Sequence, residues 1–214
     1  MDIYKKLKVK TYINAWDAVS AYGSSRMEEE TLLAMREAAT RFVHIEELQK
    51  AVGREIAKMT GNEAAYVVAG TAAGMLMASA VCMVRHPEPE LFAMLPDASE
   101  LRNEFILLRE RKTSVGYAIK AAGGKVIDVA FGQHVTLEDV ERAITPKTCA
   151  IVYCDTQVLS MRCPPLRALT LLAHKHDLFM VVQASGQLPP VEVRGAHANG
   201  ELSGAVARVD HRQN

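Results

Sequence analysis

Apolar residues in the middle of the chain fall into short continuous runs, separated by longer stretches in which apolar positions recur with a helical period. Short runs rich in Val, Ile and aromatic residues are typical of buried strands, and a spacing near 3.6 residues is typical of helices. This alternation predicts an α/β fold with a mostly parallel sheet and helices on both faces, in three layers. The predicted strands are 66–68, 104–108, 125–129, 149–153 and 179–182, and the predicted helices are 71–83, 115–122, one beginning at 136, and 166–176.

The first part of the chain has a different pattern. Residues 28–38 and 42–59 are rich in helix formers, and the apolar positions of the second stretch recur about every 3.6 residues. We therefore predict two helices, with Leu32, Leu33 and Met35 on one side of the first. His44 is interpreted as a helix-surface residue rather than a metal ligand, because no second ligand follows four residues later.

Both ends of the chain lack these patterns. Residues 1–27 are predicted to form an extended arm and a substrate loop, with a short strand at 11–14. Residues 191–214 contain no Phe, Tyr, Trp, Ile or Lys and show no periodicity, which is typical of an irregular or disordered tail. The predicted organisation is therefore an arm (1–27), a large domain (28–190) and a tail (191–214).

Composition narrows the classes of partner and compartment. Lys plus Arg equals Asp plus Glu, at 25 each, which argues against a polyanionic partner such as nucleic acid. Cys82, Cys149, Cys154 and Cys163 form no CxxC pair and fit no common zinc spacing, so we expect free thiols in a reduced cytoplasm. The sequence has neither an apolar signal core at its start nor a run long enough for a membrane span. These features predict a cytoplasmic protein with no membrane partner.

The turn between the predicted strand 66–68 and the following helix is a candidate anion site. Gly70 and Thr71 open a helix of small residues, which leaves backbone N–H groups and the positive end of the helix dipole accessible. Phosphate binding is the functional interpretation. The alternative is a turn that serves packing alone, since many α/β folds have one.

Other polar residues follow the predicted strands, where parallel sheets bind their ligands. These are residues 109–112, Asp155 and Gln183. Arg26 lies in the polar turn 23–27. It is either a solvated surface arginine or a clamp for a carboxylate or phosphate, which its planar guanidinium group suits.

Taken together, collinear stretches over residues 11–190 resemble the selenocysteine-synthase-like group of pyridoxal-phosphate (PLP) enzymes. This group has the aspartate-aminotransferase fold and includes L-seryl-tRNA selenium transferases and D-glucosaminate-6-phosphate ammonia lyases. The matching residues are Ile13 to Ala15, Gly23 to Met27, Leu48, Gly53, Ala57, Glu63 to Val67, Gly70 to Gly74, Leu95 to Asp97, Asn103 and Glu104, Tyr117 to Ile119, Ala122 and Gly123, and Gln187 to Pro190.

The resemblance implies a PLP fold-type I large domain and a role for each matching residue. Gly70, Thr71 and Ala72 would hold the cofactor phosphate, in agreement with the anion site proposed above. Arg111 stands where the family usually has a His beside the pyridine ring. Gln183 stands where it has an Asp paired with the ring nitrogen, and Ser185 stands where a small residue lies near the ring. The remaining candidate, the Arg26 clamp, would bind substrate.

Two departures bear on activity. Gln183 is neutral, so it can hydrogen-bond the ring nitrogen but cannot supply the charge that keeps it protonated. The family's Schiff-base lysine lies about 28 residues after the Asp, and position 211 here is a His. The last lysine is Lys175, on a predicted helix. We therefore expect a large domain that is incomplete at its C-terminus, through truncation or an out-of-frame end.

The implied activity is that of a PLP-dependent lyase or transferase, impaired in this chain. The reaction would be α-deprotonation and β-elimination on a small amino acid or amino sugar phosphate. The tRNA-acting members carry an extra N-terminal domain that is missing here, so we expect a small-molecule substrate rather than tRNA. A homo-oligomer is expected because this fold builds its sites at dimer interfaces. The alternatives are a non-catalytic remnant that acts through oligomer contacts and a generic nucleotide-phosphate binder.

Overall fold

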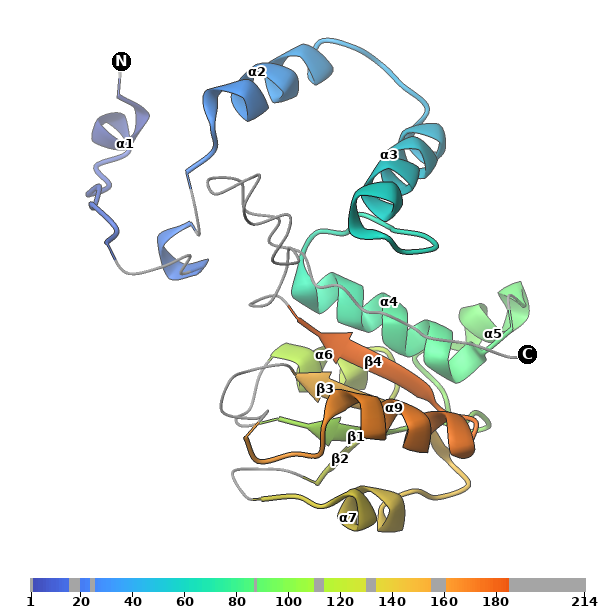
Figure 1. Cartoon of the computed structure of the whole chain (residues 1–214). Coiled ribbons are helices and arrows are strands. Elements are labelled where there is room, and N and C mark those ends of the chain that lie inside the picture. The colour runs from blue at the N-terminus through green and yellow to red at the C-terminus, as the bar shows by residue number, and fades with distance from the viewer. Residues whose placement is uncertain are drawn as a thin grey trace.

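Four parallel strands form the sheet of the part of the chain that the computed structural model describes, and their order is β2-β1-β3-β4 (Figure 1). The strands are β1 (Glu104–Leu108), β2 (Lys125–Asp128), β3 (Thr148–Cys154) and β4 (Phe179–Gln183). The described residues are 2–15, 20–23, 26–86, 88–109, 114–129, 134–154 and 161–184. β1 and β3 lie in the middle of the sheet and are almost wholly buried, which accounts for their continuous apolar runs.

Alternate side chains of each strand point to opposite faces of the sheet, and helices cover both faces. Phe105 and Leu107 of β1 belong to one core cluster, which two helices complete. Ile106 and Leu108 belong to the other, which is covered by two more helices. The three-layer α/β/α arrangement predicted from the sequence is therefore confirmed (Figure 1). The first pair of helices is α4 (Thr71–Val84) and α6 (Ser114–Ala121), and the second is α7 (Leu137–Arg142) and α9 (Leu166–Lys175).

The predicted elements of the sheet region have bounds close to those observed. Thr136 begins α7 as the predicted N-cap: the backbone N–H of Asp139 donates to Thr136 Oγ1 (3.2 Å), and the N–H of Thr136 donates to Asp139 Oδ2 (2.9 Å). This reciprocal pair satisfies two N–H groups that no helical carbonyl can reach. The short helix α5 (Pro89–Met94) was not predicted, because residues 86–89, with prolines at 87 and 89, were interpreted only as a helix breaker.

The N-terminal arm differs from its prediction in two ways. A short helix, α1 (Ile3–Lys6), forms where an extended arm was expected, and the Asp2 carboxylate caps it by accepting from the N–H of Tyr4 (2.9 Å). No strand is present at residues 11–14, because no described segment pairs with them. The rings of Tyr12 and Tyr22 lie 5.9 Å apart, and Tyr22 ends the 3-10 turn η1 (Ser20–Tyr22).

The two predicted helices of the first part of the chain are present, as α2 (Glu29–Ala38) and α3 (Ile45–Thr60), and both lie away from the sheet (Figure 1). α3 begins three residues later than expected, because His44 has an extended backbone and takes the N-cap position. α2 buries no residue. Its predicted apolar side, which includes Leu33, is exposed.

The expected strand at 66–68 is not formed. Tyr66 and Val67 are exposed, and their backbone has no neighbouring strand in the described chain. In its place the amide side chain of Gln49, on α3, bonds both backbone groups of Val67: Gln49 Nε2 donates to the Val67 carbonyl (2.6 Å), and the Val67 N–H donates to Gln49 Oε1 (3.4 Å). β-propensity alone misled the prediction, because a strand also needs a backbone partner.

All four cysteines are free of disulfides, as predicted, and all four are buried. Among the described residues, no cluster of His, Cys, Asp or Glu is arranged to hold a metal ion. No helix in the described ranges is both long and apolar enough to cross a bilayer.

Candidate functional site

The direction of α4 is fixed by a contact at its C-terminal end. Arg85, the residue after α4, donates from Nη2 to Asp177 Oδ1 (2.8 Å), and its guanidinium carbon lies 5.2 Å from the centre of the Phe179 ring. Phe179 begins β4, so α4 runs opposite to β4 along the sheet. The N-terminal end of α4 therefore lies at the carboxyl end of β4, as Figure 1 also shows.

Gly70 shapes the N-terminal end of α4. Its φ of 119° and ψ of −179° lie in a region that only glycine adopts readily, and a Cβ there would meet no atom within 4 Å. Backbone conformation, rather than space, thus requires the glycine. The first helical bond is donated by the Gly74 N–H to the Gly70 carbonyl (3.0 Å). Because of this, the N–H groups of Thr71 and Ala72 have no carbonyl within the helix to bond.

This helix end suits an anion. No side chain caps it, and its first turn carries no acidic residue that would compete for the N–H groups. Thr71 adds a hydroxyl beside those N–H groups, and Ala72 adds only a methyl group. Free backbone donors, a helix dipole and small side chains are the features with which helix ends bind phosphate. The anion site predicted at Gly70, Thr71 and Ala72 therefore has suitable geometry.

Gln183 lies at the same end of the sheet. It ends β4, is half-buried, and pairs in register with Cys154 of β3. The structure thus places Gln183 and the N-terminal end of α4 at the same end of the sheet, where the carboxyl ends of the strands lie. Its amide can donate and accept hydrogen bonds but carries no charge.

The structure places only one other predicted site residue, Arg26, among the described residues. Arg111 and Ser185 lie outside the described residues, as does Asp155. Arg26 is exposed in the segment between η1 and α2, and it forms no hydrogen bond or ion pair with the rest of the described chain. Its predicted role as a substrate clamp stays a prediction.

Sequence reasoning named Arg109 among the polar residues that follow the strands but missed its partner, Asp128. Arg109, directly after β1, donates from Nε and Nη2 to the two carboxylate oxygens of Asp128 at the end of β2, both at 2.8 Å. The Arg109 side chain is 7% exposed and that of Asp128 is 37% exposed. Gly116 of α6 allows this arrangement, since a Cβ there would lie 2.7 Å from Arg109 Nη1. The signal in the sequence was a charged residue at the end of each of two neighbouring strands.

Comparison with known proteins identifies related chains. D-glucosaminate-6-phosphate ammonia lyase of Salmonella typhimurium is 30% identical over 210 residues, covering 96% of this chain and 54% of the relative. A 5'-C-glycyluridine monooxygenase-decarboxylase of Streptomyces is 30% identical over 191 residues, covering 86% of this chain and 48% of the relative. No protein-family profile matches the sequence.

Solved structures agree with the sequence comparison. A D-glucosaminate-6-phosphate ammonia-lyase structure superimposes with a TM-score of 0.80 at 28% identity, covering 96% of this chain and 55% of that one. The aspartate aminotransferase of Thermotoga maritima shares the fold, with a TM-score of 0.51 at 17% identity, covering 85% and 48%. The chain spans about half the length of the curated relatives it matches. It is thus a homologue of D-glucosaminate-6-phosphate ammonia lyase with the fold of the aspartate aminotransferases, as the resemblance predicted.

Proposed function

We propose that this chain binds pyridoxal 5'-phosphate through the N-terminal end of α4, as part of a lyase or transferase that acts on a small amino acid or amino sugar phosphate. The observation that carries the proposal is the uncapped helix end at Gly70, which lies at the carboxyl edge of the sheet. The two relatives compared by sequence are named for different reactions, an ammonia lyase and a monooxygenase-decarboxylase. Their similarity to this chain therefore supports common descent and does not identify one substrate.

The residues present fit the cofactor at its phosphate end. Backbone N–H groups of Thr71 and Ala72 and the Thr71 hydroxyl supply donors for a dianion, and the helix dipole adds favourable charge. Gln183 would meet the ring end, where it can hydrogen-bond the ring nitrogen without fixing a proton on it. When bound, the cofactor supplies an electron sink for negative charge that develops at the α-carbon of an amino substrate.

Because Gln183 is neutral, we expect the negative charge that develops at the substrate α-carbon to be stabilised less than it would be with a carboxylate at this position. A carboxylate at this position keeps the ring nitrogen protonated through its charge, and an amide cannot. This supports the expectation of impaired chemistry in this chain. A small-molecule substrate is proposed over tRNA because the chain has no net positive charge to meet a phosphate backbone.

The proposal is tested by comparing ligands and variants in equilibrium binding to the full chain. PLP should bind more tightly than pyridoxal, which lacks the phosphate, by about tenfold or more. Thr71→Asp should abolish the difference, because a carboxylate in the first helical turn repels phosphate while it favours the helix dipole. Thr71→Asn is the matched neutral control. Equal binding of PLP and pyridoxal, or unchanged PLP affinity in Thr71→Asp, would contradict the proposal.

A non-catalytic role through oligomer contacts is the second candidate, favoured by the large exposed apolar side chains of α2 and α3. Borohydride treatment with added PLP distinguishes the catalytic from the non-catalytic role. A reducible absorbance band, mapped to a lysine by mass spectrometry, supports covalent cofactor chemistry. Its absence, together with retained phosphate-dependent binding, favours the non-catalytic role.

A further inference from the structure

The side chain of Arg109 lies between the end of β2 and the first turn of α6. Its Nε and Nη2 atoms donate to the two carboxylate oxygens of Asp128, at the end of β2. Its Nη1 atom lies against α6, because a Cβ added to Gly116 would be 2.7 Å from it. The Arg109 side chain is almost fully buried. The guanidinium therefore fills the space between the strand and the helix, and it is held on both sides.

The helices α4 and α6 begin at the same edge of the sheet. α6 follows the carboxyl end of β1 and leads to the amino end of β2, so its first turn lies at the carboxyl edge. The N-terminal end of α4 lies at that edge too. The two helices pack against each other, and residues of both belong to one buried cluster. The position of α6 therefore helps to determine the position of α4.

Met75 of α4 and Val115 of α6 make the link between the two helix starts short. Met75 comes one helical turn after Thr71, and Val115 lies in the first turn of α6. Both are buried and belong to the same cluster. Because a closely packed interior has few voids, such side chains cannot shift independently. Packed residues thus connect Arg109 to the helical turn that begins at Thr71.

We propose that Arg109 is a positioning residue for the phosphate end of the cofactor. Its two-point contact with Asp128 fixes the start of α6 and, through α6, the backbone N–H groups at the N-terminal end of α4. The inference rests on the proposed function, because it concerns the same helix end. Arg109 acts through α6 and not by contact with the cofactor. Hydrogen bonds weaken steeply with misalignment, so a small displacement of those N–H groups reduces phosphate affinity.

The opposite end of α4 has a separate anchor. Arg85 Nη2 donates to Asp177 Oδ1 (2.8 Å), and Arg85 Nη1 donates to the Asp177 carbonyl (2.9 Å). This contact lies at the amino edge, where Phe179 begins β4. α4 is 14 residues long, which places the contact about 20 Å from Gly70. Breaking it should lower stability without disturbing the phosphate end.

The test measures equilibrium binding of PLP and of pyridoxal to the full chain. The ratio of the two affinities reports the phosphate end alone, because the ring contributes to both. Arg109→Lys and Asp128→Asn should each lower this ratio at least about threefold, with pyridoxal affinity nearly unchanged. Asp177→Asn is the matched control: it should reduce the free energy of unfolding but leave the ratio at the wild-type value.

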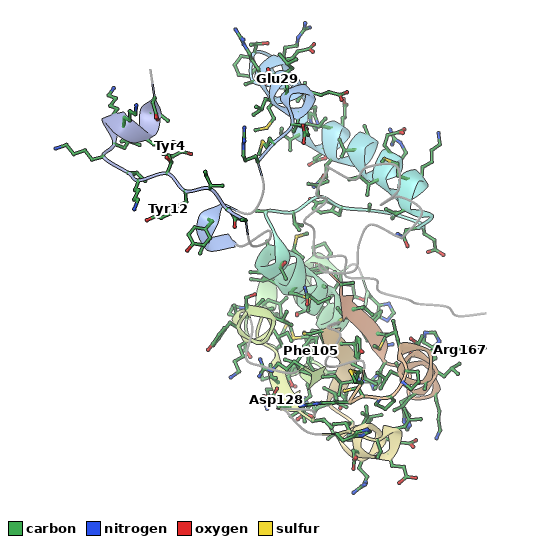
Figure 2. The ribbon with its side chains drawn as sticks, turned by 60° about the vertical axis from the view of Figure 1, so that its left-hand side comes forward. Tyr4, Tyr12, Glu29, Phe105, Asp128 and Arg167 are labelled. Carbon is green, nitrogen blue, oxygen red and sulfur yellow. The ribbon has the colours of Figure 1, made fainter. Side chains whose placement is uncertain are left out.

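The two substitutions at the ion pair also separate position from charge. Arg109→Lys keeps the positive charge and loses only the two-point geometry. Asp128→Asn removes a negative charge, which by charge alone would favour a phosphate dianion, so a fall in the ratio identifies a displacement. Figure 2 shows Asp128 in the sheet region, away from Tyr12 and Glu29 in the first part of the chain, so the substitution leaves that part unchanged.

Gly116→Ala tests the same link without removing either charge. The added Cβ would push α6 away from Arg109 Nη1, and the affinity ratio should fall as it does in the ion-pair variants. This variant keeps the test decisive if a substitution at Arg109 prevents folding.

The possible failures have different meanings. Equal affinity of the wild type for PLP and pyridoxal would contradict the proposed function, and the positioning role with it. A wild-type preference for PLP that all three carboxyl-edge variants retain would overturn the positioning role alone. An equal fall in the ratio for Asp177→Asn would also overturn it, because general loosening of the fold would then account for every variant.

Discussion

The guanidinium of Arg109 holds the carboxylate of Asp128 in a two-point contact, with both N–O distances at 2.8 Å. The two residues follow neighbouring strands, so the contact joins the carboxyl ends of β1 and β2. Arg109 is nearly buried while Asp128 is partly open to solvent. A planar arginine suits this geometry in a way that a lysine ammonium cannot, because only the guanidinium offers two parallel donors.

Arg109→Lys should destabilise the fold by about 1–2 kcal/mol. One hydrogen bond to Asp128 is lost, and the buried cation at position 109 interacts less favourably with the carboxylate. Asp128→Asn should act in the same direction, since it removes the negative charge that Asp128 places against the guanidinium. Urea unfolding measures both. Arg142→Lys, at an exposed ion pair with Asp139, is the control and should have no measurable effect. Equal effects at the two sites would mean that burial does not matter here.

Gly116→Ala should reveal the contact between α6 and Arg109. A Cβ at Gly116 would lie 2.7 Å from Arg109 Nη1, which the bond to Asp128 keeps in place. We expect the substitution to destabilise the wild type by about 1–2 kcal/mol despite the better helix propensity of Ala. In an Arg109→Ala background the same change should stabilise by about 0.5–1 kcal/mol. A double-mutant cycle on unfolding free energies measures this change of sign, and additive effects would rule out the contact.

The central strands β1 and β3 could be predicted because both of their faces are buried. Ile106 and Leu107 point to opposite faces, and both are fully buried, so the sequence there is apolar without interruption. The stretch at Tyr66 and Val67 has similar composition, yet among the described residues it pairs with a glutamine side chain and with no strand. Residue composition indicates that a segment favours extended backbone, but it does not indicate whether a neighbouring strand is present to pair with it.

The helix end at Gly70 and the pair of Arg109 and Asp128 also differ in how far the sequence predicts them. The helix end at Gly70 could be predicted because it is local: a glycine, a threonine and small residues in succession determine it. The pair of Arg109 and Asp128 depends on residues 19 positions apart in the sequence. Their contact follows from the register of β1 against β2, which no local pattern contains.

Cys82 and Cys149 should be protected from alkylation in the native protein. Both are fully buried, and burial raises the pKa of the Cys82 thiol to about 12 and that of Cys149 well above its usual value. Because the thiolate is the reactive form, iodoacetamide at pH 8 should modify them at least about 100-fold more slowly than in urea. Peptide mapping by mass spectrometry measures the rates. Cys163, at 9% exposure, is the internal comparison and should react faster.

The raised thiol pKa values also set a high-pH limit on stability. In the unfolded chain these thiols ionise near pH 9, whereas in the native state the Cys82 thiol stays protonated until about pH 12. The unfolded state therefore binds fewer protons than the native state in this window, and stability should fall as the pH rises from 9 to 12. Cys82→Ala should show a flatter decline in unfolding free energy. An identical slope in the variant would contradict the assignment.

Protonation of Glu141 should lower the stability of the fold at low pH. Its Oε1 accepts from Lys175 Nζ (2.7 Å) and lies 2.9 Å from His176 Nε2, and these hydrogen bonds lower the pKa of the Glu141 carboxyl below its ordinary value. A lowered native pKa stabilises the fold above the unfolded pKa, and this contribution is lost as the pH falls through the native pKa. Glu141→Gln should therefore be less stable than the wild type at pH 6, with the difference shrinking toward pH 3. Glu138→Gln, on the same helix, makes none of these contacts and should show no such convergence. Urea titrations measure the unfolding free energies. If the difference between Glu141→Gln and the wild type stays constant from pH 6 to pH 3, the ionised carboxylate of Glu141 does not stabilise the contact between α7 and α9.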